Sequence, residues 1–223
     1  ANEVYGASID LDEDDAAGTS AVTGPTAFAV KYQTATVAQK GVVFIGNIMF
    51  RGQHRPDGMM LSMPGKPGVF PRLNFWDSPS SDGSPIRALV SFHDRILQFR
   101  ENAMYVINIS AGHDAVENFY AEAIYKDCGV LNPCQVFIAP FGVMFVNKNG
   151  CFIYDGTKVN CLSSGKFTQE QWVSIWSSND AAEDAVNAQA TDDGRDGARI
   201  PCIGYDPRSQ SIIIARNIGH KEN

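Results

Sequence analysis

Residues 132–160 read NPCQVFIAPFGVMFVNKNGCFIYDGTKVN, and this stretch decides the fold class. It contains three short apolar runs, which are Gln135–Ala139, Val143–Val146 and Cys151–Tyr154. Asn149-Gly150 and Asp155-Gly156 favour tight primed turns, because both central residues of such a turn need positive φ, which Gly and Asn tolerate best. A further candidate strand follows the second turn. The stretch therefore predicts an antiparallel meander, the size of one propeller blade or one sheet of a sandwich.

A second meander precedes this one, in the sequence IRALVSFHDRILQFRENAMYVINIS from Ile86 onward. The dipeptides His93-Asp94 and Glu101-Asn102 divide it, as turn formers do between apolar strands. The expected strands are Ile86–Phe92, Arg95–Phe99 and Ala103–Ile109. Phe119–Tyr125 can serve as the outer strand of this meander or as the link to the next.

The flanking regions also favour strands and turns. Phe28–Tyr32 and Gly41–Phe50 predict two strands, the second with a possible bulge at Gly46, because glycine in a strand interior often marks one. After them we expect a turn at Pro56-Asp57-Gly58, a short strand at Met59–Ser62 and a loop at Pro64–Pro71. Near the end of the sequence we expect Arg199–Tyr205, a turn at 206–209, and Ser211–Arg216 as a further hairpin.

One short helix is expected at Thr168–Trp176. Thr168 and Gln171 have the spacing of a capping box, and Phe167 and Trp172 that of a hydrophobic staple. The helix is followed by the acidic, small-residue sequence SSNDAAEDAVNAQATDDGRDG, which predicts a surface insertion, so helix and insertion together occupy 167–197. Residues 1–24 carry IDLDEDDAAG and are expected to form an acidic flexible arm.

The meanders recur at a spacing typical of repeat architectures. Val42–Phe44, Ile86–Leu89 and Gln135–Phe137 lie about 45–50 residues apart, and Ile200–Gly204 follows after about 65. Three to four strands per unit at this spacing indicate a β-propeller, so the fold class is all-β, with a propeller-like domain of about four blades over 25–223. A β-sandwich with similar hairpins remains open. Four units do not close a typical ring, so other parts of the chain or a partner would supply the rest.

Composition narrows the function classes. The net charge is −7 and the acidic excess lies near Asp10–Asp15 and Asp180–Asp196, which gives no support to a basic groove that grips nucleic acid. No apolar run approaches the roughly 18 residues of a membrane span. Ala1-Asn2-Glu3 is followed by no basic and apolar leader pattern, so no secretory leader is expected.

Five cysteines with irregular spacing favour free thiols in a reducing cytoplasm over a zinc site or a disulfide framework. They are Cys128, Cys134, Cys151, Cys161 and Cys202.

Candidate metal and catalytic motifs are weak. His93-Asp94 and His113-Asp114 have the dipeptide of metal-dependent phosphohydrolases, but at strand ends we expect turns. Asp10, Asp12 and Asp14 begin like a calcium loop, yet its sixth position is Asp15 rather than glycine, and its twelfth is Ala21 rather than glutamate. Residues 192–197 could wrap a cation, although a mobile acidic loop is the simpler interpretation.

Enzyme signatures for nucleophiles, phosphate loops and dinucleotide binding do not occur in the sequence, so we expect no catalytic residues and no cofactor. Carboxylate pairs on propellers can hydrolyse glycosides, but no pair can be selected among 25 acidic residues. Trp76, Trp172 and Trp176 are expected in the core and between blades rather than on a sugar platform.

The order of several segments carries a family resemblance. They are FIGN, RPDGMMLSMPGKPGVFP, IRALVSFHDRILQFRENAMYVI and CGVLNPCQVFIAPFGVMFVNKNGCFIYDG. In this order, over about Gly41 to Ser164, the chain resembles the propeller-like tail proteins of short-tailed bacteriophages, such as nozzle, muzzle and tail-hub components.

The resemblance implies a non-enzymatic structural protein of the virion tail. Its implied partners are copies of itself in a ring, expected to be a hexamer, and neighbouring tail proteins, with genomic DNA passing through unbound. An acidic lumen would repel phosphates, and the net charge of −7 has the required sign. The alternatives are a propeller that binds or cleaves cell-surface glycans, and a general all-β interaction domain.

Overall fold

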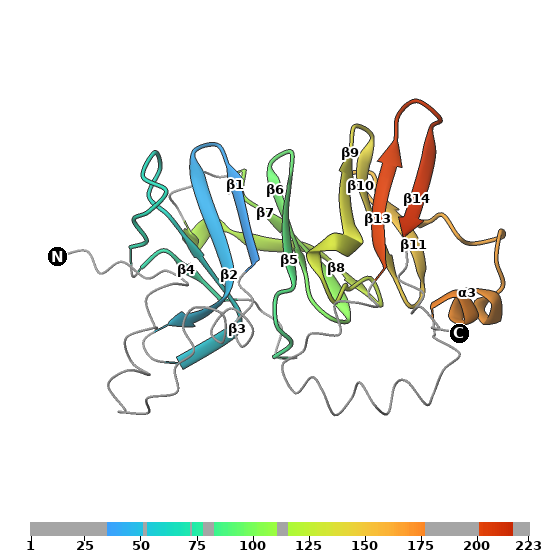
Figure 1. Cartoon of the computed structure of the whole chain (residues 1–223). Coiled ribbons are helices and arrows are strands. Elements are labelled where there is room, and N and C mark those ends of the chain that lie inside the picture. The colour runs from blue at the N-terminus through green and yellow to red at the C-terminus, as the bar shows by residue number, and fades with distance from the viewer. Residues whose placement is uncertain are drawn as a thin grey trace, which may run out of the picture. The chain divides into compact units, whose positions relative to one another are not determined.

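The structure, a computed structural model, describes residues 35–50, 53–71, 73–77, 83–110, 116–176 and 201–215. These residues form three four-stranded sheets and one two-stranded hairpin (Figure 1). Every strand pair is antiparallel, and the strands of each four-stranded sheet follow one another in chain order. The predicted all-β class and the predicted meanders are therefore confirmed.

The first sheet has the order β1-β2-β3-β4. Its strands are β1 (Ala35–Gln39), β2 (Val42–Phe50), β3 (Gln53–Leu61) and β4 (Phe75–Trp76). Lys40 and Gly41 connect β1 to β2 with φ of 47° and 78°. Two positive φ angles are what a primed two-residue turn requires. The sequence analysis identified neither β1 nor this turn.

The predicted turn at Pro56-Asp57-Gly58 is wrong, because these residues lie within β3. Gly46 pairs with Met59 and Ile48 with Arg55, so three residues of β3 oppose the single residue Asn47 of β2. The predicted irregularity beside Gly46 is thus confirmed as a bulge. Proline has no N–H to give to a neighbouring strand, so a bulge tolerates it as well as a turn does.

The second sheet has the order β5-β6-β7-β8 and matches the predicted strands closely. Its elements are β5 (Ala88–Phe92), β6 (Arg95–Phe99), β7 (Ala103–Asn108), the 3-10 turn η1 (Val116–Asn118) and β8 (Tyr120–Lys126). His93 and Asp94 form the two-residue connection between β5 and β6, as expected. β8 is the outer strand, which decides between the two roles proposed for it.

One hydrophobic core joins the first two sheets. Phe44 and Leu61 from the first sheet and Ile96 and Ile107 from the second belong to the same cluster and are completely buried. Burial of side chains of this size contributes about 1.5–3 kcal/mol each. The two sheets also meet at their first strands, because β1 lies beside β5.

The third sheet has the order β9-β10-β11-β12 and contains the stretch quoted at the start. Its elements are η2 (Pro133–Gln135), β9 (Val136–Ala139), β10 (Gly142–Asn147), β11 (Gly150–Tyr154) and β12 (Val159–Cys161).

Both predicted hairpins of the third sheet are present, but their turns differ from the prediction. Asn147 pairs with Gly150, so Lys148 and Asn149 are the central residues, and neither has positive φ. The next connection spans four residues between Tyr154 and Val159. In the first turn a side-chain acceptor replaces the primed backbone angles, since Asn147 Oδ1 accepts from Asn149 N at 2.8 Å. In the second turn Gly156 has a φ of 101°, and Asp155 Oδ1 accepts from Thr157 N.

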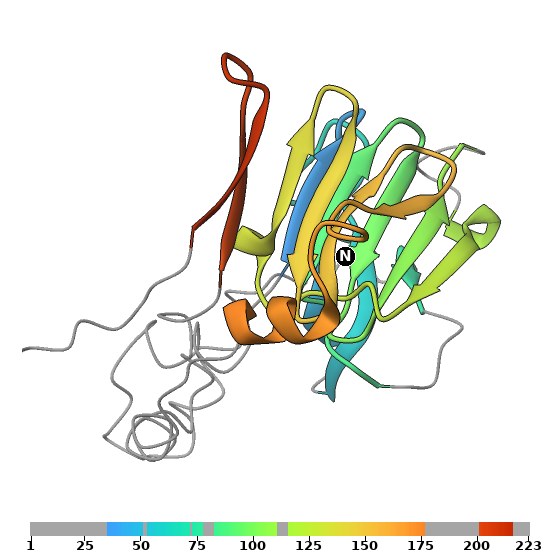
Figure 2. The same ribbon diagram turned by 90° about the vertical axis from the view of Figure 1, so that its right-hand side faces the viewer.

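The last described elements are α3 (Gln169–Trp176) and the hairpin of β13 (Cys202–Asp206) and β14 (Ser211–Ala215). The predicted capping box is confirmed, because Gln171 N donates to Thr168 Oγ1 and Thr168 N donates to Gln171 Oε1. The predicted staple is also present, with the rings of Phe167 and Trp172 5.9 Å apart. Figure 2 shows the hairpin beside β9.

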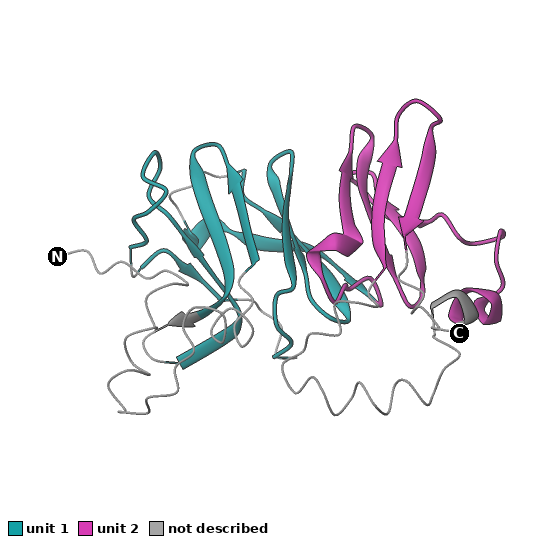
Figure 3. Cartoon of the chain, viewed as in Figure 1, with its two compact units in different colours: residues 1–126 teal, residues 127–223 magenta. Residues whose placement is uncertain are grey.

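The chain divides into two compact units, residues 1–126 and 127–223 (Figure 3). The first holds the first two sheets, and the second holds the third sheet, α3 and the hairpin. The predicted arm at 1–24, the strand Phe28–Tyr32 and the insertion after the helix lie outside the described residues.

The repeat spacing needs one correction. Val42–Phe44 belongs to the second strand of its sheet, whereas Ile86–Leu89 leads into a first strand. The four first strands begin at residues 35, 88, 136 and 202. The steps between them are therefore 53, 48 and 66 residues, which keeps the predicted period but shifts its start to β1.

Candidate functional site

The dipeptide His93-Asp94 serves the turn that it forms. Asp94 makes an ion pair with Lys40, and the carbonyl of His93 accepts a hydrogen bond from Gln39. Both partners belong to the β1–β2 hairpin, so these contacts join the turns of the first two sheets. The carboxylate of Asp94 therefore stabilises the contact between these two turns.

The described residues contain no group of three His, Cys, Asp or Glu side chains that could hold a metal ion. The other candidate metal motifs, at His113-Asp114, Asp10–Asp14 and 192–197, lie outside the described residues.

Two of the three tryptophans lie in the core, as the sequence analysis expected. Trp76 is 7% exposed and its Nε1 donates to the carbonyl of Phe119 at 3.4 Å. Trp172 is 5% exposed and its Nε1 donates to the carbonyl of Asn147 at 3.0 Å. A buried indole satisfied in this way cannot stack on a sugar. The side chain of Trp176 lies outside the described residues.

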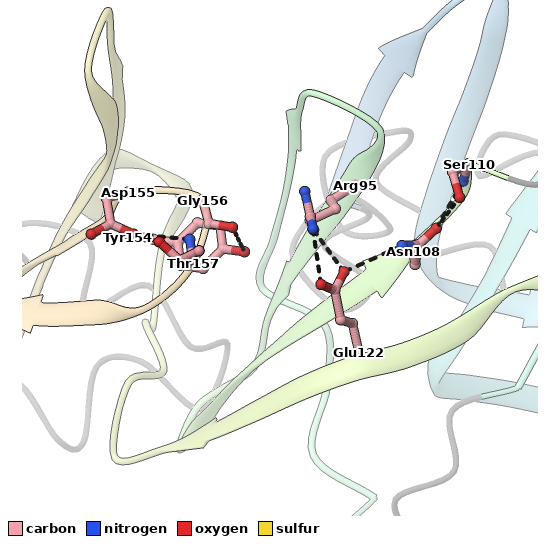
Figure 4. A network of polar contacts seen from close by, with 8 residues as sticks. All are labelled: Arg95, Asn108, Ser110, Glu122, Tyr154, Asp155, Gly156 and Thr157. Carbon is pink, nitrogen blue, oxygen red and sulfur yellow. Dashed lines mark hydrogen bonds and ion pairs between the residues drawn. The ribbon is translucent and has the colours of Figure 1, made fainter.

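A polar network ties three strands of the second sheet together (Figure 4). Arg95 on β6 contacts Glu122 on β8 through two hydrogen bonds, of 2.6 and 2.8 Å. Asn108 on β7 donates to Glu122 and accepts from Ser110. The hydrogen bonds from Arg95 are the main reason that the pKa of Glu122 is lowered. The network therefore cross-links the surface of the second sheet.

A second polar arrangement closes the β11–β12 connection (Figure 4). Asp155 Oδ1 accepts from the backbone N–H groups of Thr157 and Lys158 and from the hydroxyl of Thr157. Asp155 Oδ2 accepts from Asn160. These hydrogen bonds, led by the one from Lys158, lower the pKa of the carboxyl. All of these partners lie within five residues of Asp155, so Asp155 acts as a turn former.

The β13–β14 hairpin, which we call the edge hairpin (Cys202–Ala215), offers a surface of a different kind. One of its faces, with Ile203 and Tyr205 of β13, packs on Ala139 and Met144 of the third sheet. Phe141 and Tyr205 extend this contact, with ring centroids 5.1 Å apart. The hairpin is thereby fixed to its unit through β13.

β14 is exposed along its whole length. Ile212, Ile213 and Ile214 are 39%, 54% and 38% exposed, and β13 is the one strand that pairs with β14 among the described residues. An uncharged apolar strand with an open edge is a template for pairing, and natural proteins protect such edges or use them to bind. We therefore take β14 as the candidate interaction surface. The sequence analysis predicted this strand but gave no reason to expect its exposure.

Comparisons with known proteins leave the family open. No protein-family model and no curated protein matches the chain. Within the described residues, no helix is long and apolar enough to cross a membrane.

Proposed function

We propose that the protein is a structural, non-enzymatic component of a bacteriophage tail. In this proposal each chain has a propeller-like fold, and several copies form a nozzle- or muzzle-type ring around the DNA exit channel. The observation that carries the fold part of this proposal is the arrangement of first strands. β1 lies beside β5 in the first unit, and β9 lies beside β13 in the second. In a propeller the innermost strands of successive blades converge on the axis in this way.

The segments that resemble tail proteins coincide with the sheets. IRALVSFHDRILQFRENAMYVI covers β5, β6 and most of β7, and the segment that ends in CFIYDG runs from η2 through β11. FIGN lies in β2, and RPDGMMLSMPGKPGVFP covers most of β3 and the loop after it. Each piece falls within a single sheet or its adjoining loop, and this order supports a shared architecture more strongly than scattered short matches would.

The edge hairpin supports the assembly part of the proposal. A head-to-tail contact between identical subunits closes into a ring when its rotation fits, and such a contact uses two different surfaces of each subunit. β14 offers one of them, because a strand from a neighbouring subunit would pair with its open edge and cover its isoleucines.

Charge is consistent with a DNA channel. The sequence carries 25 acidic and 18 basic residues, and like charges repel phosphates from a wall that DNA must pass without sticking. The glycan-binding alternative has less support, because Trp76 and Trp172 are buried and cannot provide an exposed sugar platform.

The proposed contact is tested by replacing Ile213 with lysine. Ile213 is 54% exposed and points away from the face that carries Ile212 and Ile214, so the change should leave the fold intact. Leu73→Lys is the matched control, since Leu73 is 87% exposed in the first unit. Mass photometry should find the ring disrupted by Ile213→Lys and preserved by Leu73→Lys. Equal assembly of both variants would contradict a role for β14.

A further inference from the structure

Two thiols that are far apart in the sequence meet where the edge hairpin begins. Cys134 lies in η2 and Cys202 is the first residue of β13. Cys134 Sγ donates to the carbonyl of Pro201, the residue directly before Cys202, at 3.9 Å. Burial, and after it the neighbouring Cys202 thiol, raise the pKa of Cys134 to about 11. Cα atoms of η2 and β13 approach within 8 Å of each other. The two Cα atoms of a disulfide lie at most about 7 Å apart, so adjacent segments such as η2 and β13 are where one can form.

Hydrogen bonds from neighbouring side chains fix the backbone around Cys134. Asn132 Oδ1 accepts from Cys134 N at 3.0 Å, and Gln135 Oε1 accepts from the backbone N–H groups of Leu131 and Asn132. Gln135, which is completely buried, also donates to the carbonyl of Val146 on β10. Cys134 is therefore presented from a capped turn attached to the third sheet.

The backbone at Cys202 is fixed by strand pairing and by the burial of the next residue. It pairs with Ala215 of β14, and the next residue, Ile203, is buried in the core on the third sheet. The Cys202 side chain is exposed and that of Cys134 is partly exposed, whereas Cys128 and Cys151 are buried. The pair is thus ordered and also open to a small reagent.

We propose that Cys134 and Cys202 form a disulfide site that is closed by a low-molecular-weight disulfide such as oxidised glutathione. The exposed Cys202 thiolate attacks one sulfur of the reagent, which breaks the reagent's S–S bond and releases one small thiol. Because the pKa of Cys134 is raised to about 11, only its small thiolate fraction then attacks Cys202 Sγ and releases the second small thiol, and this step becomes faster as the pH rises. Two protein thiols are oxidised and the reagent is reduced to two thiols, with the two protons passing to water and the released thiolates.

The bond would fasten the start of the edge hairpin to the third sheet. At present Ile203, Tyr205 and Phe141 make that attachment through apolar contacts. A covalent link restricts the unfolded chain as well as the hairpin, so it would resist separation of β13 from the sheet. This inference goes beyond the proposed function and does not depend on it.

The experiment uses the full chain, treated with oxidised glutathione, alkylated and digested with trypsin. We expect one linked pair of peptides, residues 127–148 and 200–208, and a fall in titratable thiols from five to three. The first peptide also contains Cys128, so Cys128→Ser is the control that must retain the link. Cys134→Ser must abolish the link and leave glutathione attached to Cys202.

Three results would overturn the inference. They are a link that survives Cys134→Ser, a link that passes through Cys161, and glutathione on Cys202 of the wild-type chain with no internal link. Far-UV circular dichroism of each variant establishes that it is folded. The presence or absence of the linked peptides in the wild-type chain tests the inference even if a variant does not fold.

Discussion

At the scale of single residues, Gly142 occupies a position with no room for a side chain. A Cβ there would lie 2.5 Å from the carbonyl oxygen of Tyr154, on the neighbouring strand. Because the obstacle is backbone, we expect Gly142→Ala to lower the free energy of unfolding by about 1–3 kcal/mol. Gly204→Ala is the control, since a Cβ at Gly204 meets nothing within 4 Å, and its effect should stay within about 0.5 kcal/mol. Urea unfolding measures both, and equal stabilities would contradict the geometry.

Asp155 should make the stability of the second unit sensitive to acid. Its pKa is lowered in the folded chain, so the stability from its carboxylate is present above the ordinary pKa of about 4. That stability is lost as the pH falls from there through the lowered value. Asp155→Ala should therefore lower the urea midpoint at pH 7, and the gap to wild type should narrow below about pH 4. A gap that stays constant with pH would show that the charge is not involved.

Residue-scale chemistry was only partly predictable from the sequence. Asn149-Gly150 and Asp155-Gly156 correctly marked chain reversals, but the turns use side-chain acceptors where primed backbone angles were expected. The contact between Cys134 and Cys202 could not be predicted, because it joins segments whose approach is set by tertiary packing.

At the scale of elements, Trp172 anchors α3 among the side chains of the helix that the structure describes. Trp172 is buried in the core with Met144 and Val146, and its Nε1 donates to the Asn147 carbonyl. Trp172→Phe keeps most of the apolar burial but loses that hydrogen bond, so it should cost about 1 kcal/mol. Trp172→Ala should cost about 3–5 kcal/mol, because it also leaves a cavity.

Urea unfolding followed by circular dichroism measures the loss of stability caused by each of the two substitutions. If the two substitutions were equally mild, Trp172 would not be the anchor of the helix.

Element prediction succeeded where apolar periodicity was strong and failed where it was weak. β5, β6, β7 and β10 are mainly apolar and lie between clear turn formers, and the sequence placed them to within a few residues. β1 reads ATVAQ and β4 reads FW, which are too short or too polar to be recognised. Pro56-Asp57-Gly58 has the composition of a turn, but a bulge can use the same residues.

At the scale of the whole molecule, the recurrence of meanders was predictable but the surface that they leave open was not. Regular spacing of strands predicted successive antiparallel sheets, and the structure has three of four strands and one of two. The candidate interface on β14 arises because β13 is the one strand that pairs with β14 among the described residues. Sequence periodicity reports which faces are apolar and not which of them remains uncovered.

The most direct test of the proposed function is the assembly state of the purified chain, measured by mass photometry and negative-stain electron microscopy. A tail-ring subunit should form a closed ring with a central channel, expected to contain six copies, and should bind DNA weakly. A monodisperse monomer at micromolar concentration, with no rings on the grid, would contradict the account.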